Sequence, residues 1–333
     1  MKPIKGEATM KAKWIRWCWA VLCVLPVCAG AQSYPTQNVR IVVPYAPGGG
    51  IDAMARVLAE RLQQKWGKPV IVENKPGAST IIGAVAVTKA PPDGHTLLLT
   101  SEATITSNPF LFDKLPYDPT RELIPISQLV SLPQMVVANP SVAASNLNEL
   151  VALARARPDL LSYASYGSGS LPHLFFEGVK ARRGVKMTQI PYKGITPAVT
   201  AVLSGEVQLT LAGVPAAQGY LRAGKLKALA IARRERLPEL PEVPTLAEAG
   251  FGDIDPHESW FGLFATGRTP ASVVRTIAQD VAAVTADATF RERYVTARGF
   301  DPVFSTPEAF ARSIQADRRQ KEKLIRLTGA KAE

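Results

Sequence analysis

Three consecutive glycines at residues 48–50 stand between a β-branched run and a helical pattern, and this combination constrains the chain more than any other stretch. Residues 39–43 are rich in valine and isoleucine, as buried strands are, and two prolines end the run because proline has no N–H for a sheet ladder. Residues 53–62 then place apolar side chains at helical spacing, with Asp52 at the expected N-cap. The stretch predicts a strand, a glycine loop and a helix N-terminus in succession.

A loop of this kind favours an anion. Backbone N–H groups point into one concavity, the helix dipole lies behind them, and glycine lets a ligand approach closely. The chain has neither the lysine-containing phosphate loop of nucleotide hydrolases nor the G-x-G-x-x-G pattern of dinucleotide folds, so a smaller anion such as a carboxylate fits better. The alternative is a tight turn that binds nothing, because an Asp52 cap would use the same N–H groups.

The same arrangement returns in the second half of the chain. Residues 161–164 are typical of a strand, residues 165–170 of a loop with three serines, and residues 171–176 of a helix with proline in its first turn, where proline is tolerated. The serine hydroxyls add hydrogen-bond donors for an anion, although a serine-rich helix cap explains the same residues. Two such units, one in each half, favour a ligand held between them.

Strands and helices alternate along the rest of the chain, which indicates an α/β architecture with largely parallel sheets. Ser101 and Thr104 follow the strand expected at residues 96–100, at the sheet edge where open parallel sheets bind ligands. Residues 105–130 carry four prolines and are expected to be irregular. The last helix, expected at residues 306–327, ends in a run of charges that we interpret as a solvated face.

The N-terminal segment has the features of a secretory signal peptide covering residues 1–31. A basic start precedes an apolar core at residues 17–27, too short to span a bilayer, and a small-x-small site that would leave Gln32 first. All three cysteines lie in this segment, so the exported chain would lack disulfides and thiol chemistry. A lipoprotein with acylated Cys28 is the alternative. Without this segment, which holds five basic residues and one glutamate, the formal charge falls from +11 to +7.

Several classes of function are disfavoured by the remaining sequence. Lysines and arginines are scattered, which is not typical of a nucleic-acid surface, and no later apolar run is long enough for a membrane span. No cluster of histidine and acidic residues has metal-ligand spacing, so we expect no metal and no cofactor. A serine hydrolase with Ser165 or Ser168 as nucleophile and His173 as base lacks the G-x-S-x-G elbow and an orienting acid. We therefore expect a protein that is not an enzyme.

Ordered motifs along nearly the whole exported chain resemble those of the Bug-type (TctC-like) extracytoplasmic solute receptors of tripartite tricarboxylate transporters. The resemblance implies a two-lobed periplasmic binding protein fold of type II, in which each lobe is a mostly parallel sheet flanked by helices. The motifs include V-V-P-Y-A-P-G-G-G at 42–50, V-E-N-K-P-G-A at 72–78, P-D-G-H-T-L at 92–97, L-P-Y-D at 115–118, P-Y-K-G at 191–194 and P-E-V-P-T at 241–245.

The resemblance also implies how the chain is divided and how it works. Residues 32–133 and 260–333 would form lobe 1, and residues 134–259 would form lobe 2, hinged by crossing strands near 132–137 and 260–265. The ligand would lie in the cleft, the lobes would close over it, and a periplasmic monomer would deliver it to the membrane permease subunits. A sensor that reports the ligand to a membrane kinase is the alternative role.

The family pattern further implies which residues meet the ligand. The first glycine loop would hold one carboxylate through backbone N–H groups and water, and polar groups of the second lobe would hold the other end. Carried over by position, the expected ligand-binding residues are Tyr45, Gly48, Gly49, Gly50, Asp52, Ser101, Thr104, Ser165, Gly169, Ser170, His173 and, at the rim, Tyr192.

Two departures from the family pattern bear on the ligand. Ile51 follows the glycines where many members have serine or threonine, and Ala212 and Gly213 stand where members that bind amino acids can place an acidic residue. Because no carboxylate would then meet an ammonium group, the expected ligand is a small organic carboxylate, such as a dicarboxylate, that lacks an amino group.

Overall fold

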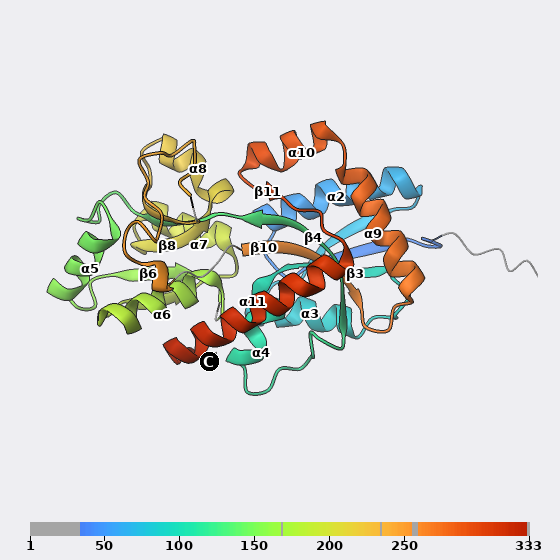
Figure 1. Cartoon of the computed structure of the whole chain (residues 1–333), viewed down its shortest axis with the longest axis horizontal. Helices are drawn as coiled ribbons and strands as arrows, with labels where there is room; N and C mark the ends of the chain where they lie inside the picture. Colours follow the sequence, from blue (N-terminus) through green and yellow to red (C-terminus); the bar gives the residue numbers. More distant parts are fainter. Residues whose placement is uncertain (1–33, 168, 234, 255–258, 332–333) are drawn as a thin grey trace, which may run out of the picture.

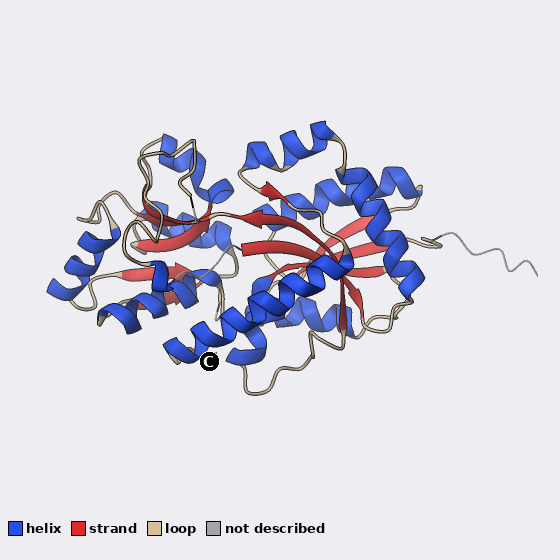
Figure 2. Ribbon diagram, viewed as in Figure 1, coloured by secondary structure: helices blue, strands red, loops and turns tan. Residues whose placement is uncertain are grey.

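The computed structural model describes residues 34–167, 169–233, 235–254 and 259–331, and it shows two α/β units lying end to end along the long axis (Figures 1 and 2). One unit is built on a six-stranded sheet with the order β11-β4-β10-β3-β1-β2, and the other on a five-stranded sheet with the order β7-β6-β8-β5-β9. We call these units lobe 1 and lobe 2. The expected two-lobed α/β fold is confirmed, whereas the predicted signal peptide lies outside the described residues.

Lobe 1 has helices on both faces of its sheet, because its central strands bury side chains on both sides. The strands are β1 (Val39–Val43), β2 (Val70–Asn74), β3 (Thr96–Ser101), β4 (Leu123–Leu132), β10 (Ser259–Thr266) and β11 (Asp301–Pro302). One face packs against α2 (Gly50–Trp66) and α9 (Ala271–Thr285), and the other against α3 (Ile81–Thr88) and α11 (Pro307–Thr328). Shorter elements are η1 (Ala78–Thr80), the π-helical turn η2 (Ala103–Ser107), α4 (Asn108–Leu111), α10 (Ala288–Tyr294) and η4 (Thr296–Arg298).

Lobe 2 repeats this layered arrangement on a smaller scale. Its strands are β5 (Gln134–Ala138), β6 (Ser162–Ser165), β7 (Thr188–Pro191), β8 (Leu209–Gly213) and β9 (Lys227–Ala232). One face packs against α5 (Leu147–Ala156) and α6 (Leu171–Arg183), and the other against α7 (Ile195–Ser204) and α8 (Val214–Arg222). The short turn η3 (Gly252–Ile254) follows before the chain returns to lobe 1.

Both sheets are mixed, where the sequence predicted mostly parallel ones. The strands β1, β2 and β3 are parallel to one another, as are β6, β7 and β8. The strands β10 and β5 run antiparallel to their neighbours. These two strands adjoin the points where the chain passes from one lobe to the other, so their direction is set by the crossover and not by a local βαβ repeat.

The chain leaves lobe 1 at Pro133, between β4 and β5, within the segment expected to cross. The segment expected to cross near residues 260–265 lies in β10, which pairs with β3 and β4 along its length and belongs to lobe 1. The return crossing precedes Ser259. At the junction Ser259 is the register partner of Leu132, which places the two ends of the connection side by side.

The C-terminal helix α11 lies across both lobes (Figure 1). Phe310 is fully buried in the core of lobe 1, while Leu324, farther along the helix, packs with Leu174 of α6 in lobe 2. Lys321 corrects our interpretation of the charged run as a solvated face, because it is 1% exposed and pairs with Asp317 at 3.7 Å. The helix therefore buries one of its charges against the rest of the protein.

The strand β4 was missed because of its proline. Pro125 pairs with Phe264 at a shift in register between β4 and β10, where the ladder is already irregular. A proline at such a bulge costs no regular ladder hydrogen bond. Proline content alone therefore gave a wrong expectation of irregular structure for this part of residues 105–130.

Within the described residues, no helix combines the length and the apolar character needed to cross a bilayer. The same residues contain no group of three or more histidine, cysteine or acidic side chains placed to hold a metal ion.

Candidate ligand-binding cleft

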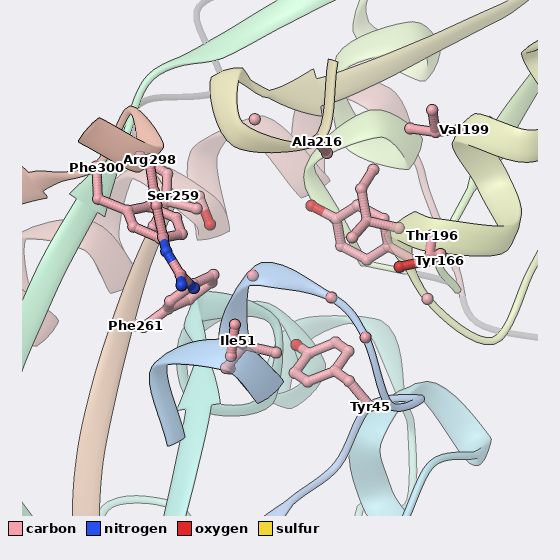
Figure 3. A pocket seen from close by; sticks show the side chains of 18 of the residues that line it. Tyr45, Ile51, Tyr166, Thr196, Val199, Ala216, Ser259, Phe261, Arg298 and Phe300 are labelled. Carbon is pink, nitrogen blue, oxygen red and sulfur yellow. The ribbon is translucent and has the colours of Figure 1, made fainter. Parts of the chain in front are cut away.

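A cavity of about 510 Å³ lies between the lobes and is lined by residues of both (Figure 3). Lobe 1 contributes the first glycine loop, the end of β3, and residues of β10 and η4. Lobe 2 contributes Tyr166 and residues of α7 and α8. Five of the expected site residues line this cavity, namely Tyr45, Gly48, Gly49, Gly50 and Ser101. The other expected residues are not among those that line it.

The first glycine loop leads directly into α2, but the N-cap is Gly49 and not Asp52 as predicted. Gly49 has an extended backbone (φ −79°, ψ 169°) and provides no side-chain cap. The first N–H groups of a helix have no intrahelical acceptor, and this end of the helix dipole is positive. Because Gly48, Gly49, Gly50 and Ile51 all line the cavity, the positive end of α2 opens onto it.

Asp52 braces the loop from inside α2. Its carboxylate accepts hydrogen bonds from the Gly48 N–H (3.0 Å), from Arg56 (3.0 Å) and from the Asn74 amide (2.9 Å). Burial alone would raise the pKa of Asp52, but these hydrogen bonds hold it below the ordinary value of 3.8. Asp52 is 4% exposed and does not line the cavity. Its hydrogen bonds shape the loop, and its direct contact with a ligand stays a prediction.

Tyr45 and Ser101 form a polar pair in the cavity wall, with 2.7 Å between their hydroxyl oxygens. Burial raises the pKa of Tyr45, so its phenol stays protonated and keeps a hydrogen to donate. Thr104, which was expected beside them, is fully buried, donates to the Thr80 hydroxyl at 2.8 Å and does not reach the cavity. Thr104 therefore lies behind the cavity wall, and its contact with a ligand stays a prediction.

The second glycine loop turns its polar groups into the protein. The Ser165 hydroxyl accepts from the Gln189 amide at 2.8 Å, and the His173 Nδ1 accepts from the Gly169 N–H at 3.0 Å. Ser165, Ser170 and His173 are all buried, and none lines the cavity. Burial lowers the pKa of His173, which keeps the imidazole neutral and able to accept. The structure thus places these three residues outside the cavity lining, with internal partners, and their contact with a ligand stays a prediction. Ser168 lies outside the described residues.

Gly169 and Tyr192 are also placed away from the cavity. Gly169 has a φ of +79°, and a Cβ there would lie 2.0 Å from Leu111 Cδ1, so the loop needs glycine where it meets lobe 1. The Tyr192 hydroxyl donates to Glu206 at 2.9 Å within lobe 2. Both residues have structural contacts here, and their ligand contacts stay predictions.

Other lining residues were missed by the sequence analysis. Tyr166 follows Ser165 directly, so the right loop was predicted but the wrong side chain within it. Thr196 and Thr200, on α7, come just after the P-Y-K-G motif and supply hydroxyls from lobe 2. Arg298 and Phe300 follow the helices near the C-terminus and carried no signal in the sequence (Figure 3).

The two lobes face each other across a narrow gap. A Cβ on Gly49 would lie 3.6 Å from Ile195 Cγ2 and 3.7 Å from Thr196 Oγ1, both on α7. At the edge of the cleft, Arg233 of lobe 2 pairs with Asp301 of lobe 1 at 3.5 Å. A ligand in the cavity would therefore touch both lobes at once.

Residues 54–330 match the family model described as the tripartite tricarboxylate transporter family receptor, TctC. The chain belongs to this receptor family. Protein BugT of Bordetella pertussis is 36% identical over 303 residues, which cover 90% of this chain and 92% of BugT.

Solved structures of TctC-type receptors superpose along most of the chain. The periplasmic binding protein BugD is 32% identical with a TM-score of 0.83, and the match covers 90% of this chain and 100% of BugD. Rpa4515 of R. palustris with adipate is 31% identical with a TM-score of 0.84, covering 89% and 98%. MatC of Rhodopseudomonas palustris with bound malate is 30% identical with a TM-score of 0.82, covering 88% and 100%.

Family membership decides between the classes considered for the sequence. TctC-family homologues are solute-binding receptors, and the prediction that this chain is not an enzyme is confirmed by that relationship. Geometry also disfavours Ser165 as the nucleophile of the hydrolase alternative, because it is buried and its hydroxyl accepts a hydrogen bond from Gln189.

Proposed function

We propose that this protein is a periplasmic receptor that binds a small organic carboxylate without an amino group and delivers it to the permease of a tripartite tricarboxylate-type transporter. The observation that carries the proposal is the uncapped N-terminus of α2, which opens onto the cavity between the lobes. Rpa4515 with adipate and MatC with malate support the choice of a carboxylate.

In this proposal the loop binds one carboxylate through backbone N–H groups. Gly48, Gly49 and Gly50 have no side chains to block the approach, and the Tyr45 and Ser101 hydroxyls are close enough to each other to act together. Each hydrogen bond to a charged group contributes roughly 1.5–3 kcal/mol. A few such bonds, after the cost of ordering and lobe closure, give about −8 kcal/mol, which is micromolar affinity.

The absence of an amino group is inferred from the lining residues that the structure describes. None of them is acidic, so nothing among them offers a countercharge to an ammonium group. A buried ammonium without a partner would cost several kcal/mol. We therefore expect plain carboxylates to bind more tightly than amino acids with the same carbon skeleton.

Thermal-shift measurements on the purified protein test the proposal. We would compare adipate, malate, hexanoate and glutamate at fixed pH and ionic strength. A ligand at about 100 times its dissociation constant stabilises a protein by roughly 2.7 kcal/mol, which gives a readable shift. Stabilisation by the plain carboxylates and not by glutamate supports the proposal. Stabilisation by glutamate alone would contradict it.

The export step has a separate test. We propose that residues 1–31 are removed during export, so that the protein from a periplasmic fraction begins at Gln32. Intact-mass analysis and N-terminal sequencing check this. A mass that includes an acylated Cys28 would instead identify a lipoprotein.

A further inference from the structure

Arg298 is the single charged side chain among the described residues that line the cavity. It comes from η4 in lobe 1 and is half-buried. Figure 3 shows its guanidinium group in the cavity, beside the rings of Phe261 and Phe300 and on the same side as Ile51. A charge in this position acts directly on whatever the cleft encloses.

The ion pairs among the described residues leave Arg298 without a carboxylate. Its guanidinium carbon lies 5.5 Å from the centre of the Tyr294 ring. Arg293 stands over the same ring at 5.4 Å, but it is exposed and does not line the cavity. The two arginines thus share one aromatic contact and differ in access to the cleft.

Two positive features therefore face the cavity from lobe 1. One is the N-terminus of α2, and the other is Arg298. When the lobes close, water is excluded, and an unpaired charge in a site without water is costly. A ligand with a single carboxylate balances one of these features and leaves the other unpaired. A ligand with two anionic groups balances both.

The wall between the two features is apolar. Phe261 and Phe300 form an edge-to-face pair with ring centres 5.6 Å apart. A Cβ on Gly50 would lie 3.0 Å from Phe300 Cζ, so this aromatic pair directly adjoins the glycine loop. Ile51 and Leu132 add aliphatic surface nearby. Such a wall favours a hydrocarbon spacer over a chain that carries hydroxyl groups.

We propose that Arg298 is a specificity-determining residue that pairs with the second anionic group of the ligand and selects dicarboxylates with an apolar spacer over monocarboxylates of equal length. The inference rests on the proposed function, because it assumes that the first carboxylate binds at the start of α2. It goes further by assigning the preference for a dianion to one side chain.

Isothermal titration calorimetry with adipate and hexanoate tests the assignment, because the two acids share a six-carbon chain and differ in the second carboxylate. We expect the wild-type protein to bind adipate at least about 10-fold more tightly than hexanoate, the least that one charge-assisted hydrogen bond provides. In R298Q the ratio should fall to about one through loss of adipate affinity, with hexanoate affinity unchanged. R298K, which keeps the charge, should retain part of the ratio.

Arg293→Gln is the matched control, since it removes a positive charge and a contact with the Tyr294 ring but lies outside the cavity. It should keep the wild-type ratio, and thermal melts should show all variants folded. Equal losses for both acids in R298Q would mean that Arg298 shares the first carboxylate, and an unchanged ratio would mean that it binds neither; each result overturns the assignment. Wild-type protein that binds neither acid would overturn the assignment of a dicarboxylate with an apolar spacer, whereas stabilisation by none of the plain carboxylates in the thermal-shift comparison would overturn the proposed function itself.

Discussion

The two glycine loops of this protein share one hydrogen-bond pattern but lie in different surroundings. In the first loop the Gly48 N–H donates to Asp52, four residues along, and in the second the Gly169 N–H donates to His173, also four residues along. Both loops lead from a strand into a helix. The first lines the cavity between the lobes, whereas the expected contact residues of the second face the protein interior.

The difference lies in what each loop faces. A Cβ on Gly49 would meet α7 of the opposite lobe at ordinary contact distance, across the edge of the cavity. A Cβ on Gly169 would overlap Leu111 of lobe 1, and one on Gly167 would lie 2.9 Å from the Ser79 hydroxyl. The second loop is therefore a contact between lobes. A strand, a glycine loop and a helix thus predict exposed N–H groups only when no other chain segment covers them.

The largest effect should come from filling the contact of the second loop. Gly169→Ala forces a left-handed backbone on alanine and drives its Cβ into Leu111. Overpacking and backbone strain together should lower the free energy of unfolding by about 3 kcal/mol. Urea denaturation measures this. Gly184→Ala is the control, because Gly184 has a similar φ of +64° with open space around it and should lose only about 1 kcal/mol.

Equal losses in the Gly169 and Gly184 variants would show that the Leu111 contact is soft and that the second loop is not tightly held against lobe 1. Burial of the second loop against lobe 1 would then not be what distinguishes it from the first loop.

A smaller effect, on affinity, should come from the first loop. In Gly49→Val the added methyl groups extend toward Ile195 and Thr196, which keeps the lobes apart and screens the N–H groups. We expect adipate affinity to fall about 30-fold, or about 2 kcal/mol, without a matching loss of stability. Calorimetry measures the affinity. Gly49→Ala, whose Cβ makes only ordinary contacts, should stay near wild type; a Gly49→Val variant that binds normally would remove the first loop from the site.

Asp52 and His173 accept hydrogen bonds from the first and second loops, and we expect them to respond differently to pH. Burial lowers the pKa of His173 in the folded protein below its ordinary value of 6.5, so the unfolded chain binds a proton first and stability falls as pH drops through that range. Asp52, with a pKa below 3.8, remains ionised there. The free energy of unfolding, measured in urea at pH 7.5, 6.5 and 5.5, should decrease, and His173→Gln should flatten the decrease. An unchanged slope in that variant would exclude His173 as its source.

The smallest effect should come from Ser165→Ala. Its hydroxyl is bound by Gln189 and not by a ligand in the cavity, so adipate affinity should change by less than about twofold, while stability falls by about 1 kcal/mol. Calorimetry and urea denaturation measure the two quantities on one preparation. A tenfold loss of adipate affinity would mean that the second loop also contacts the ligand, so that the two loops would not differ in this respect.

Local features were predictable from the sequence, and features set by distant contacts were not. The first loop and α2 were found because residues 39–62 carry strand, loop and helix signals in direct succession. The direction of β10 and the irregular pairing of Pro125 depend on partners more than a hundred residues away, which no local period records. Because the proline content indicated irregular structure and the strand partner of Pro125 was not visible in the local sequence, β4 was not predicted.

The same limit explains the site. Tyr45 follows β1 and Ser101 ends β3, the neighbouring strand of the same sheet, so strand order alone places them together. Which residues of lobe 2 reach the cavity depends on how the lobes dock, and Tyr166 faces it while Ser165, its neighbour, does not. Arg298 lies in a short turn without a pattern of its own, and only the tertiary fold places it in the cleft.

Trp260 lies between the sheet of lobe 1 and α11, so its fluorescence should report on the position of α11. Its ring meets Phe310 edge-on with centres 5.2 Å apart, and its Nε1 donates to Asp317 at 3.2 Å. The other tryptophan of the described chain, Trp66, is bound to Asp280 at the far end of α2. If the lobes close over a ligand as proposed, movement of α11 would shift the emission of one indole and leave the other as an internal reference. The proposed closure could then be followed in solution without attaching a dye.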